Sequence, residues 1–349
     1  MKLMDMAGKW NYLERAWGEP VLVADFKLEP ADFQVVEELG FEPDGVGEHL
    51  WLYIEKTGMT TFEAQAVLAR YFKLQLRDTA FSGMKDRQGI TRQWFSFHLG
   101  IHDHAAALNF QHPRLTILRV MSNSRKLRRG SHRSNGFCIT LRNFQGDLNV
   151  CMARLQLLTQ QGVPNYFGSQ RFGKDEGNVS RALDWFRGTI KLPERKEQSL
   201  LLSAVRSFLF NTVLSERVAS QNWNTCVEGD VMALAGTASI FASGRASTEE
   251  LVQRLALFDI HPTGPLWGSG PLATTSVAAA QERNVANRFP ELLAGLESHG
   301  LVQERRALRL KINNLKSHFD DTTLQLEFSL ERGAYATTVL RELCVMEVM

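Results

Sequence analysis

Strand-like alternation of apolar and polar residues is present at both ends of this 349-residue chain, and it constrains the fold more than any other feature. Four apolar side chains near the C-terminus alternate with polar ones, as in a strand with one buried face: Leu324, Leu326, Phe328 and Leu330. Similar patterns occur at residues 21–23, 33–37 and 50–54. Because residues 160–310 follow mostly helical spacing, we expect an insertion after which the last strand returns to the first domain's sheet.

Capping and turn signals predict where the other elements begin and end. Thr60 and Glu63 form a capping box that opens a helix ending near Phe72, and Asp147 is placed to cap a helix through Leu158. The remaining expectations are strands at 95–99, 115–120 and 137–144, helices at 199–220 and 336–343, a second capping box at 247–250, a loop at 264–268, and a helix at 277–296 interrupted at Pro290.

The composition is that of a globular protein, with 44% hydrophobic residues, 22% charged residues and a net charge of +2. It excludes a disordered chain and a uniformly basic packaging protein. The sequence has no run of 18 apolar residues and no apolar core of a signal peptide, so we expect neither a membrane span nor export. The four cysteines form no C-x-x-C pair, which favours a reducing cytoplasm over a zinc ribbon. Nucleotide-binding motifs are missing too, so we expect no cofactor and no metal.

The charges are distributed unevenly along the chain. Residues 25–56 carry nine acidic and two basic side chains, whereas residues 104–146 carry eight Lys and Arg and no acid. The dense part of the basic stretch contains Arg125, Lys126, Arg128, Arg129 and Arg133. A solvated loop is the ordinary explanation of a short charge run. Here no nearby acid in the sequence offsets the charge, so a polyanion such as a nucleic acid is a plausible partner.

One short string places a carboxylate between two cations. In residues 81–94, Asp86 lies between Lys85 and Arg87 in a turn that leads into a strand. A nearby cation lowers the pKa of a carboxyl group and keeps it ionised, and an ionised, partly desolvated carboxylate can act as a nucleophile or a base. An ordinary surface turn with ion pairs would give the same string, so the residues alone leave both interpretations open.

Five blocks of the sequence resemble the TruD family of tRNA pseudouridine synthases. Residues 83–93 resemble the family signature G-x-K-D-[RK]-x-A-x-T-x-Q, and residues 27–37 resemble its K-x-x-P-x-D-F-x-V-x-E block. The other three blocks are the basic stretch followed by N-x-F at 125–137, G-x-P-N-Y-F-G-x-Q-R-F-G at 162–173, and the C-terminal element at 336–343. They stand in the family's order and span essentially the whole chain. Three departures are Gly89, where the signature has Ala, residues 134–136, where Ser-Asn-Gly replaces Gly-Asn-Ala, and Tyr335, where Phe is expected.

The resemblance implies an α+β fold and a cofactor-free isomerase. We expect a pseudouridine-synthase-like catalytic domain with a mixed or antiparallel sheet, built from residues 1–160 and 310–349, and an inserted, mostly helical TRUD domain at 161–309. The implied reaction converts uridine 13 of tRNA, with tRNA-Glu as the expected substrate, to pseudouridine. The uridine leaves its stack to reach the enzyme. We also expect a monomer that acts in the cytoplasm.

The same resemblance assigns roles to individual residues. Asp86 would be the essential aspartate, acting either as a nucleophile on carbon or as a base on the C2′ proton, and Lys27 is preferred over Lys85 as its partner cation. Phe137 would stack on the uracil and Asn135 would bind its edge. Phe33, Lys85 and Tyr335 would complete the substrate pocket. The RNA backbone would be bound by Arg125, Lys126, Arg128, Arg129 and Arg133.

Two other functions are compatible with a basic, RNA-binding chain. A non-catalytic RNA-binding protein or RNA chaperone would keep the scaffold without using Asp86. A methyltransferase would need a glycine-rich strand-loop for its cofactor, and the sequence shows none.

Overall fold

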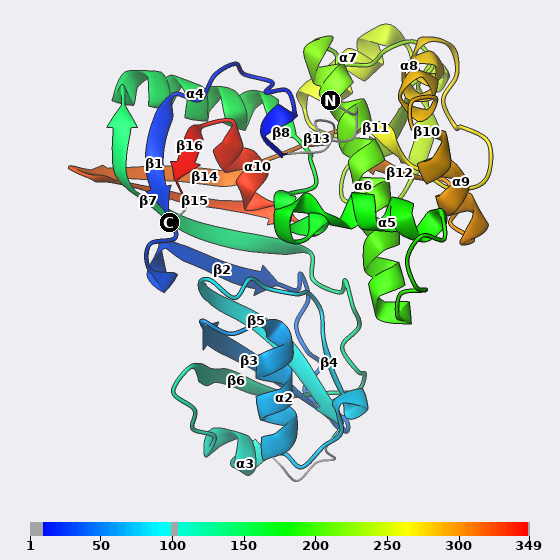
Figure 1. Ribbon diagram of the computed structural model, residues 1–349. Helices are drawn as coiled ribbons and strands as arrows, with labels where there is room; N and C mark the ends of the chain where they lie inside the picture. Colours follow the sequence, from blue (N-terminus) through cyan, green and yellow to red (C-terminus); the bar gives the residue numbers. More distant parts are fainter. Residues whose placement is uncertain (1–9, 99–103, 348–349) are drawn as a thin grey trace. The chain divides into compact units, whose positions relative to one another are not determined.

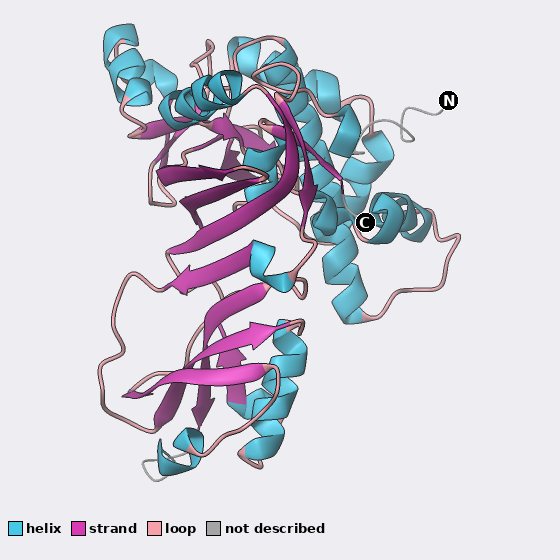
Figure 2. Cartoon of the chain, turned by 90° about the vertical axis from the view of Figure 1, so that its left-hand side faces the viewer, coloured by secondary structure: helices cyan, strands magenta, loops and turns pink. Residues whose placement is uncertain are grey.

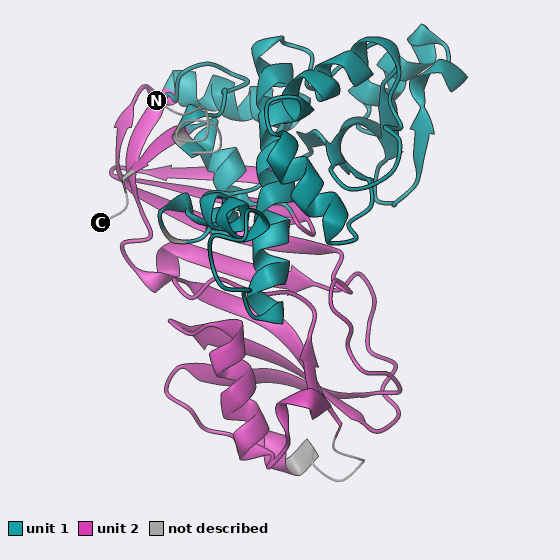
Figure 3. Ribbon diagram, turned by 45° about the vertical axis from the view of Figure 1, so that its right-hand side comes forward, with its two compact units in different colours: residues 1–21, 149–311, 334–343 teal, residues 22–148, 312–333, 344–349 magenta. Residues whose placement is uncertain are grey.

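The computed structural model describes residues 10–98 and 104–347. The chain forms two compact units, each assembled from separate stretches of sequence (Figure 3). Unit 1 comprises residues 1–21, 149–311 and 334–343, and unit 2 comprises residues 22–148, 312–333 and 344–349. The unit boundaries fall at 148/149 and 311/312, whereas the family-based domain boundaries at 160 and 310 stay a prediction.

Unit 2 is built on a ten-stranded mixed sheet (Figures 1 and 2). Its main path runs in the order β14-β15-β7-β2-β5-β3-β6, with β1 on β7, β16 on β1, and β4 on β5. The strands are β1 (Leu22–Phe26), β2 (Phe33–Glu38), β3 (His49–Thr57), β4 (Thr79–Phe81), β5 (Ile90–His98), β6 (Leu115–Asn123), β7 (Ser134–Gly146), β14 (Asn313–Asp320), β15 (Thr323–Glu331) and β16 (Cys344–Glu347). The β2–β5 and β1–β16 pairs are parallel and the others antiparallel.

Helix α2 (Thr61–Tyr71) covers the hydrophobic face of the strands on either side of the loop that contains Asp86. Its capping box is formed as the sequence predicts: the Thr60 hydroxyl accepts from the Glu63 N–H, and the Glu63 carboxylate accepts from the Thr60 N–H. Leu68 on its inner face packs with apolar residues of β3 and β5. This packing fixes the strands on both sides of the turn that carries Asp86. The short helix α3 (His104–Leu108) precedes β6.

Unit 1 contains most of the helices and a second sheet. The long helix α6 lies in a large hydrophobic cluster with α5, α8 and α9. The helices are α4 (Leu148–Gln161), α5 (Asn178–Phe186), α6 (Arg195–Ala219), α7 (Thr248–Ala256), α8 (Ser276–Ala286), α9 (Pro290–Ser298) and α10 (Ala336–Arg341). The strands are β8 (Val163–Pro164), β9 (Val231–Leu234), β10 (Ile240–Ala242), β11 (Ile260–Leu266), β12 (Glu304–Ala307) and β13 (Arg309–Leu310).

Most element predictions are confirmed, and two are wrong in part. At the second capping box the Ser247 hydroxyl accepts from the Glu250 N–H, but the Glu250 carboxylate accepts from Arg254. The strand expected at 95–99 is part of β5 as far as His98, and Leu99 lies outside the described residues. The α+β class, the returning strand β15 beside β7, and the break at Pro290 between α8 and α9 all agree with the structure. The expected loop at 264–268 is strand through Leu266, because β11 pairs with β9 and β12 in a four-stranded sheet. No helix among the described residues is long and apolar enough to cross a membrane.

Candidate active site

Asp86 lies in the loop between β4 and β5, at residues 82–89. The two strands pair in antiparallel fashion, with Phe81 opposite Phe95, so the loop turns sharply at one end of the sheet. The Asp86 carboxylate is 22% exposed, and its Oδ1 accepts a hydrogen bond of 3.2 Å from the Gln88 N–H. The side chain is therefore shielded but still reachable by a ligand.

Lys27 is the cation that contacts this carboxylate. Its Nζ lies 2.5 Å from Asp86 Oδ2, and its side chain is only 9% exposed. Lys27 follows β1 in a left-handed conformation with φ 63°, which costs a non-glycine residue about 1–2 kcal/mol. The ammonium also lies 3.9 Å from the centroid of the Phe33 ring, a cation–π contact. Strain, burial and two partners together fix the charge beside Asp86.

The electrostatic balance at Asp86 favours the ionised form. Burial alone would raise the pKa of the Asp86 carboxyl group, because a desolvated charge is disfavoured. The charge and hydrogen bond of Lys27, with the backbone N–H groups of Gln88 and Arg87, outweigh this penalty and lower the pKa below its ordinary value. Asp86 is thus a carboxylate at neutral pH even though it is partly buried.

Lys85, the other cation considered from the sequence, has a different partner. Its Nζ lies 2.6 Å from Glu37 Oε2, and both side chains are buried. Glu37 Oε1 also accepts from the Trp94 N–H, so this carboxylate is satisfied on both oxygens. Because adjacent side chains point apart on an extended segment, Asp86 and Lys85 reach different neighbours.

The predicted substrate aromatics meet on one face of the sheet. Phe33 on β2 and Phe137 on β7 have ring centroids 6.3 Å apart, and both residues are buried. Phe137 stands opposite Phe328 in the β7–β15 register, with the rings stacked at 5.4 Å. Asp86, Lys27, Phe33 and Phe137 therefore form a continuous chain of contacts.

Asn135 lies two residues before Phe137 on β7, opposite Glu37 of β2. It is 8% exposed, and its Oδ1 has no hydrogen-bond partner in the described part of the chain. A buried acceptor without a partner is costly, and it is a common feature of sites that await a ligand donor.

The basic stretch is exposed and anchored to the Asp86 loop. Among the described residues, no carboxylate lies within 4.0 Å of the five cations, Arg125, Lys126, Arg128, Arg129 and Arg133. The Ser82 hydroxyl accepts from the His132 N–H at 2.8 Å and lies 2.7 Å from His132 Nδ1. Burial lowers the pKa of His132, so its neutral ring can accept the Ser82 proton.

Two of these cations also have neutral contacts in unit 2. The guanidinium of Arg129 covers the Phe81 ring at 3.4 Å, and Lys126 donates to the Arg77 carbonyl. These contacts orient the two charged groups without pairing them with a carboxylate, so their positive charge is available to an anion.

Tyr335, expected at the edge of the substrate pocket, belongs to unit 1. Its hydroxyl accepts a hydrogen bond of 3.0 Å from Arg171, and its ring packs edge-on to Phe167. The 162–173 block thus supports Tyr335 locally. A role for Tyr335 beside Asp86 stays a prediction.

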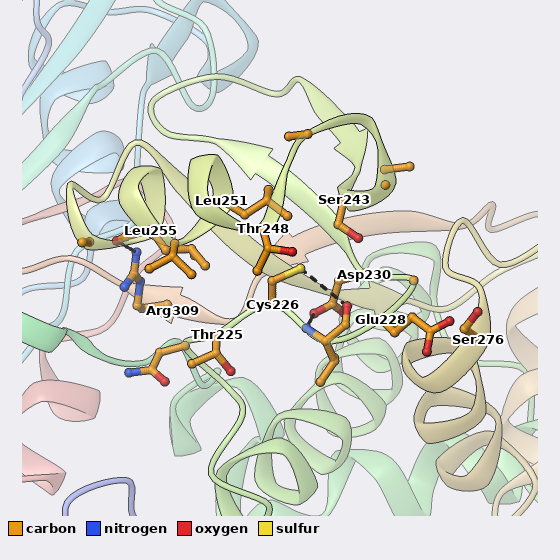
Figure 4. Close-up of a pocket in the computed structure, with 18 of the residues that line it drawn as sticks. Thr225, Cys226, Glu228, Asp230, Ser243, Thr248, Leu251, Leu255, Ser276 and Arg309 are labelled. Carbon is orange, nitrogen blue, oxygen red and sulfur yellow. Dashed lines mark hydrogen bonds between the residues drawn. The ribbon is translucent and has the colours of Figure 1, made fainter.

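A cavity with a different character lies in unit 1 (Figure 4). It encloses about 850 Å³ between α7, the start of α8 and the loop that contains Cys226 and Asp230. Both Asp230 oxygens accept from the Arg217 guanidinium at 2.9 Å, and burial raises the pKa of the Cys226 thiol. Burial therefore favours the protonated form of the Cys226 thiol, and Arg217 occupies both oxygens of the buried Asp230 carboxylate in the described lining.

Sequence reasoning missed three polar residues that support the Asp86 loop: Glu37, Lys56 and His132. Lys56 had a detectable signal, because position 56 continues the inward-facing alternation of Leu50, Leu52 and Ile54 on β3. Lys56 is fully buried there. A lysine on a buried strand face is unusual enough to indicate a specific partner.

Gly89 explains one departure from the family signature. Its φ is 155°, and a Cβ at this position would lie 2.4 Å from the Phe33 carbonyl oxygen. Only glycine allows the Asp86 loop to approach β2 this closely. No group of three His, Cys, Asp or Glu side chains is placed to hold a metal within residues 10–98 and 104–347.

Comparisons with known proteins identify the family and agree with the fold. The family described as tRNA pseudouridine synthase D (TruD) matches residues 14–183 and 179–343. A tRNA pseudouridine synthase D of Ectopseudomonas mendocina is 46% identical over 334 residues, covering 94% of this chain and 93% of the relative. The protein of the same name from Pseudomonas entomophila is 44% identical over 330 residues, with the same coverage of each chain.

A solved structure supports the fold independently. A Methanosarcina mazei structure that carries the TruD name matches with a TM-score of 0.72 at 20% identity, covering 94% of this chain and 95% of the other. At that identity the match concerns the fold alone. Together with the family match over nearly the whole length, it leads to one assignment. The chain belongs to the tRNA pseudouridine synthase D (TruD) family.

Proposed function

We propose that this protein is a tRNA pseudouridine synthase that isomerises uridine 13 of tRNA, with tRNA-Glu as the expected substrate. The observation that carries the proposal is the ion pair between Lys27 and Asp86, which keeps a partly buried carboxylate charged. The family match supports a tRNA substrate, and the exposed cations at 125–133 provide a surface for its phosphates.

The reaction rearranges one nucleotide without adding or removing atoms. The bond between N1 of uracil and C1′ of ribose breaks, the base turns, and C5 joins C1′. The proton on C5 is lost and N1 gains one. Asp86 acts either as a nucleophile on carbon or as the base that removes the C2′ proton, and both routes need its ionised form. Lys27 keeps Asp86 in its ionised form, so the proposed role of Asp86 is compatible with either route.

The surrounding residues would hold the extruded base. Asn135 Oδ1, which lacks a donor among the described residues, is suited to accept the N3–H of uracil, and its amide group can donate to a uracil oxygen. Phe137 would stack on the base and Phe33 would border it. Lys85 and Tyr335 are proposed as further contacts. Base extrusion costs a few kcal/mol, which stacking and edge hydrogen bonds partly offset.

The test uses purified protein and an unmodified tRNA-Glu transcript labelled with tritium at uracil C5, without added cofactor. Wild type should release tritium, and carbodiimide mapping should place the product at position 13. Asp86→Asn should lower the rate by at least about 10³-fold, because an amide is neither a base nor a nucleophile here.

A matched control separates the loss of a charge from the loss of the site. Asp321→Asn removes the same charge from an exposed turn of unit 2 and should leave the rate unchanged. Turnover by Asp86→Asn would disprove the role of Asp86. A wild-type protein that binds tRNA without converting any uridine would instead support the non-catalytic RNA-binding alternative.

A further inference from the structure

Lys56 is a fully buried lysine whose ammonium group contacts the backbone of the Asp86 loop. Its Nζ donates to the carbonyl oxygen of Asp86 at 2.7 Å and to that of Met59 at 2.6 Å. The first carbonyl lies between β4 and β5, and the second lies between β3 and α2. One side chain on β3 therefore joins the loop that carries the carboxylate to the segment that starts α2.

This ammonium group is buried without a carboxylate partner. Among the described residues no carboxylate oxygen lies within 4.0 Å of its Nζ. Its two hydrogen bonds go to carbonyl oxygens, and the charges of Asp86 and Glu63 act on it only from a greater distance. Burying a cation in this way is costly. An apolar residue would suit the inward face of β3 better, as Leu50, Leu52 and Ile54 do. The fold could be stabilised at this position by an apolar side chain, so we infer that the lysine serves the function of the protein.

Other residues of the loop are held by neutral hydrogen bonds in addition to the Lys85–Glu37 ion pair. The Lys85 N–H donates to the Thr61 hydroxyl at 2.9 Å, and the Gln93 amide donates to the Gly83 carbonyl at 3.1 Å. Lys56 adds a charged hydrogen bond to Asp86 itself. Charge-assisted hydrogen bonds are shorter and about twice as strong as neutral ones.

We propose that Lys56 is a positioning residue for the isomerisation, holding the main chain of Asp86 so that its carboxylate stays against Lys27. The proposal rests on the proposed catalytic role of Asp86. Within the described part of the chain, Lys56 Nζ bonds to the Asp86 carbonyl and not to its carboxylate oxygens, so it acts through the backbone. Its positive charge also favours the ionised form of Asp86.

The charge of Lys56 is sensitive to pH near neutrality. Burial lowers its pKa to about 8, an effect to which Lys85 adds and which Asp86 and Glu63 oppose. As the pH rises through about 8, Lys56 becomes neutral and its hydrogen bond to the Asp86 carbonyl weakens. The rate of the chemical step should therefore fall on the alkaline side with an apparent pKa near 8.

The experiment measures single-turnover rates on the unmodified transcript from pH 6 to 10, together with KM, tRNA affinity and the urea midpoint of unfolding. Lys56→Met should lower the chemical rate by about 10- to 100-fold, the range typical of a misplaced catalytic group. It should change KM and tRNA affinity less than about two-fold and remove the alkaline decline near pH 8. The urea midpoint of unfolding should not fall, because the variant loses two hydrogen bonds but also avoids the cost of burying a charge.

Control variants and the wild type keep the test decisive. Lys316→Met removes a lysine from an exposed position of β14 and should leave every readout unchanged. A Lys56→Met protein with the wild-type rate and pH profile would overturn the proposal. An activity loss fully explained by a lower folded fraction would overturn it too, in favour of a structural role.

If Lys56→Met does not fold, two measurements still decide the matter. Lys56→Gln keeps a hydrogen-bond donor without the charge and should lose the alkaline decline, and a wild-type profile that is flat through pH 8 refutes the proposal. Failure of the proposed function is recognised separately, by turnover in Asp86→Asn or by its absence in wild type.

Discussion

Lys27 combines a left-handed backbone, a buried side chain and an ion pair with Asp86. Each of these features is costly alone, and their coincidence at one residue indicates that the position serves the site rather than the fold. The choice between Lys27 and Lys85 as the contact of Asp86 could be argued from the sequence, because adjacent side chains diverge. The pairing of Lys85 with Glu37 could not, since it depends on the register between β2 and the Asp86 loop.

The pH dependence of a Lys27 variant tests the electrostatic argument. In Lys27→Met, burial should raise the pKa of Asp86, since the largest opposing effect is gone. The chemical rate should fall by about 10²-fold at pH 7, and it should fall further as the pH drops toward 5, where wild type stays flat. Rate profiles from pH 4.5 to 7.5 measure this. Parallel profiles for the two proteins would show that Lys27 does not set the ionisation of Asp86.

Among the elements, strands with strict alternation were predictable and the unit 1 sheet was not. β11 contains Pro262, Gly264 and Pro265, which normally argue against a strand. β10 is short and largely exposed, so it lacks the apolar period that marks a buried face. Those strands form because long-range pairing with β9 and β12 outweighs weak local preference.

The exposed cations at 125–133 should contribute additively to tRNA binding. In the double variant Arg125→Gln/Arg128→Gln, binding should weaken for every tRNA, and the slope of log affinity against log salt should decrease by about 2, because two phosphates are no longer neutralised. Filter binding between 50 and 300 mM salt measures the slope. The pair Lys73→Gln/Lys316→Gln removes two exposed charges elsewhere in unit 2 and is the control. An unchanged slope would place the RNA away from this segment.

On the scale of the whole molecule, the sheet of unit 2 combines three separate stretches of sequence. The return of the chain to a strand pattern after the helical middle was enough to predict that a C-terminal stretch rejoins this sheet. The sequence did not show that residues 10–21 and 149–161 belong to unit 1. It also did not reveal β16, whose four residues carry no distinct alternation.

Removal of β16 tests how much this last segment supports the sheet. β16 pairs in parallel with β1, from Leu22 opposite Cys344 to Asp25 opposite Glu347, and it covers an edge that leads directly to Lys27. A chain ending at Leu343 should unfold at a temperature several degrees lower, because it leaves β1 unpaired on one side. Differential scanning calorimetry measures this, and an unchanged midpoint would mean that β16 is dispensable. Activity should decline with it, since β1 positions Lys27.

The buried lysine on β3 also has a consequence for anyone who adapts this enzyme to heat. Because its pKa is about 8 in the folded chain and near 10.5 when exposed, folding expels a proton between these values. Resistance to unfolding should therefore rise with alkalinity over that interval, where the speed of the reaction falls. Selection for thermal stability alone would favour replacing this amine with a hydrocarbon side chain. The resulting enzyme would withstand higher temperatures but catalyse the reaction more slowly.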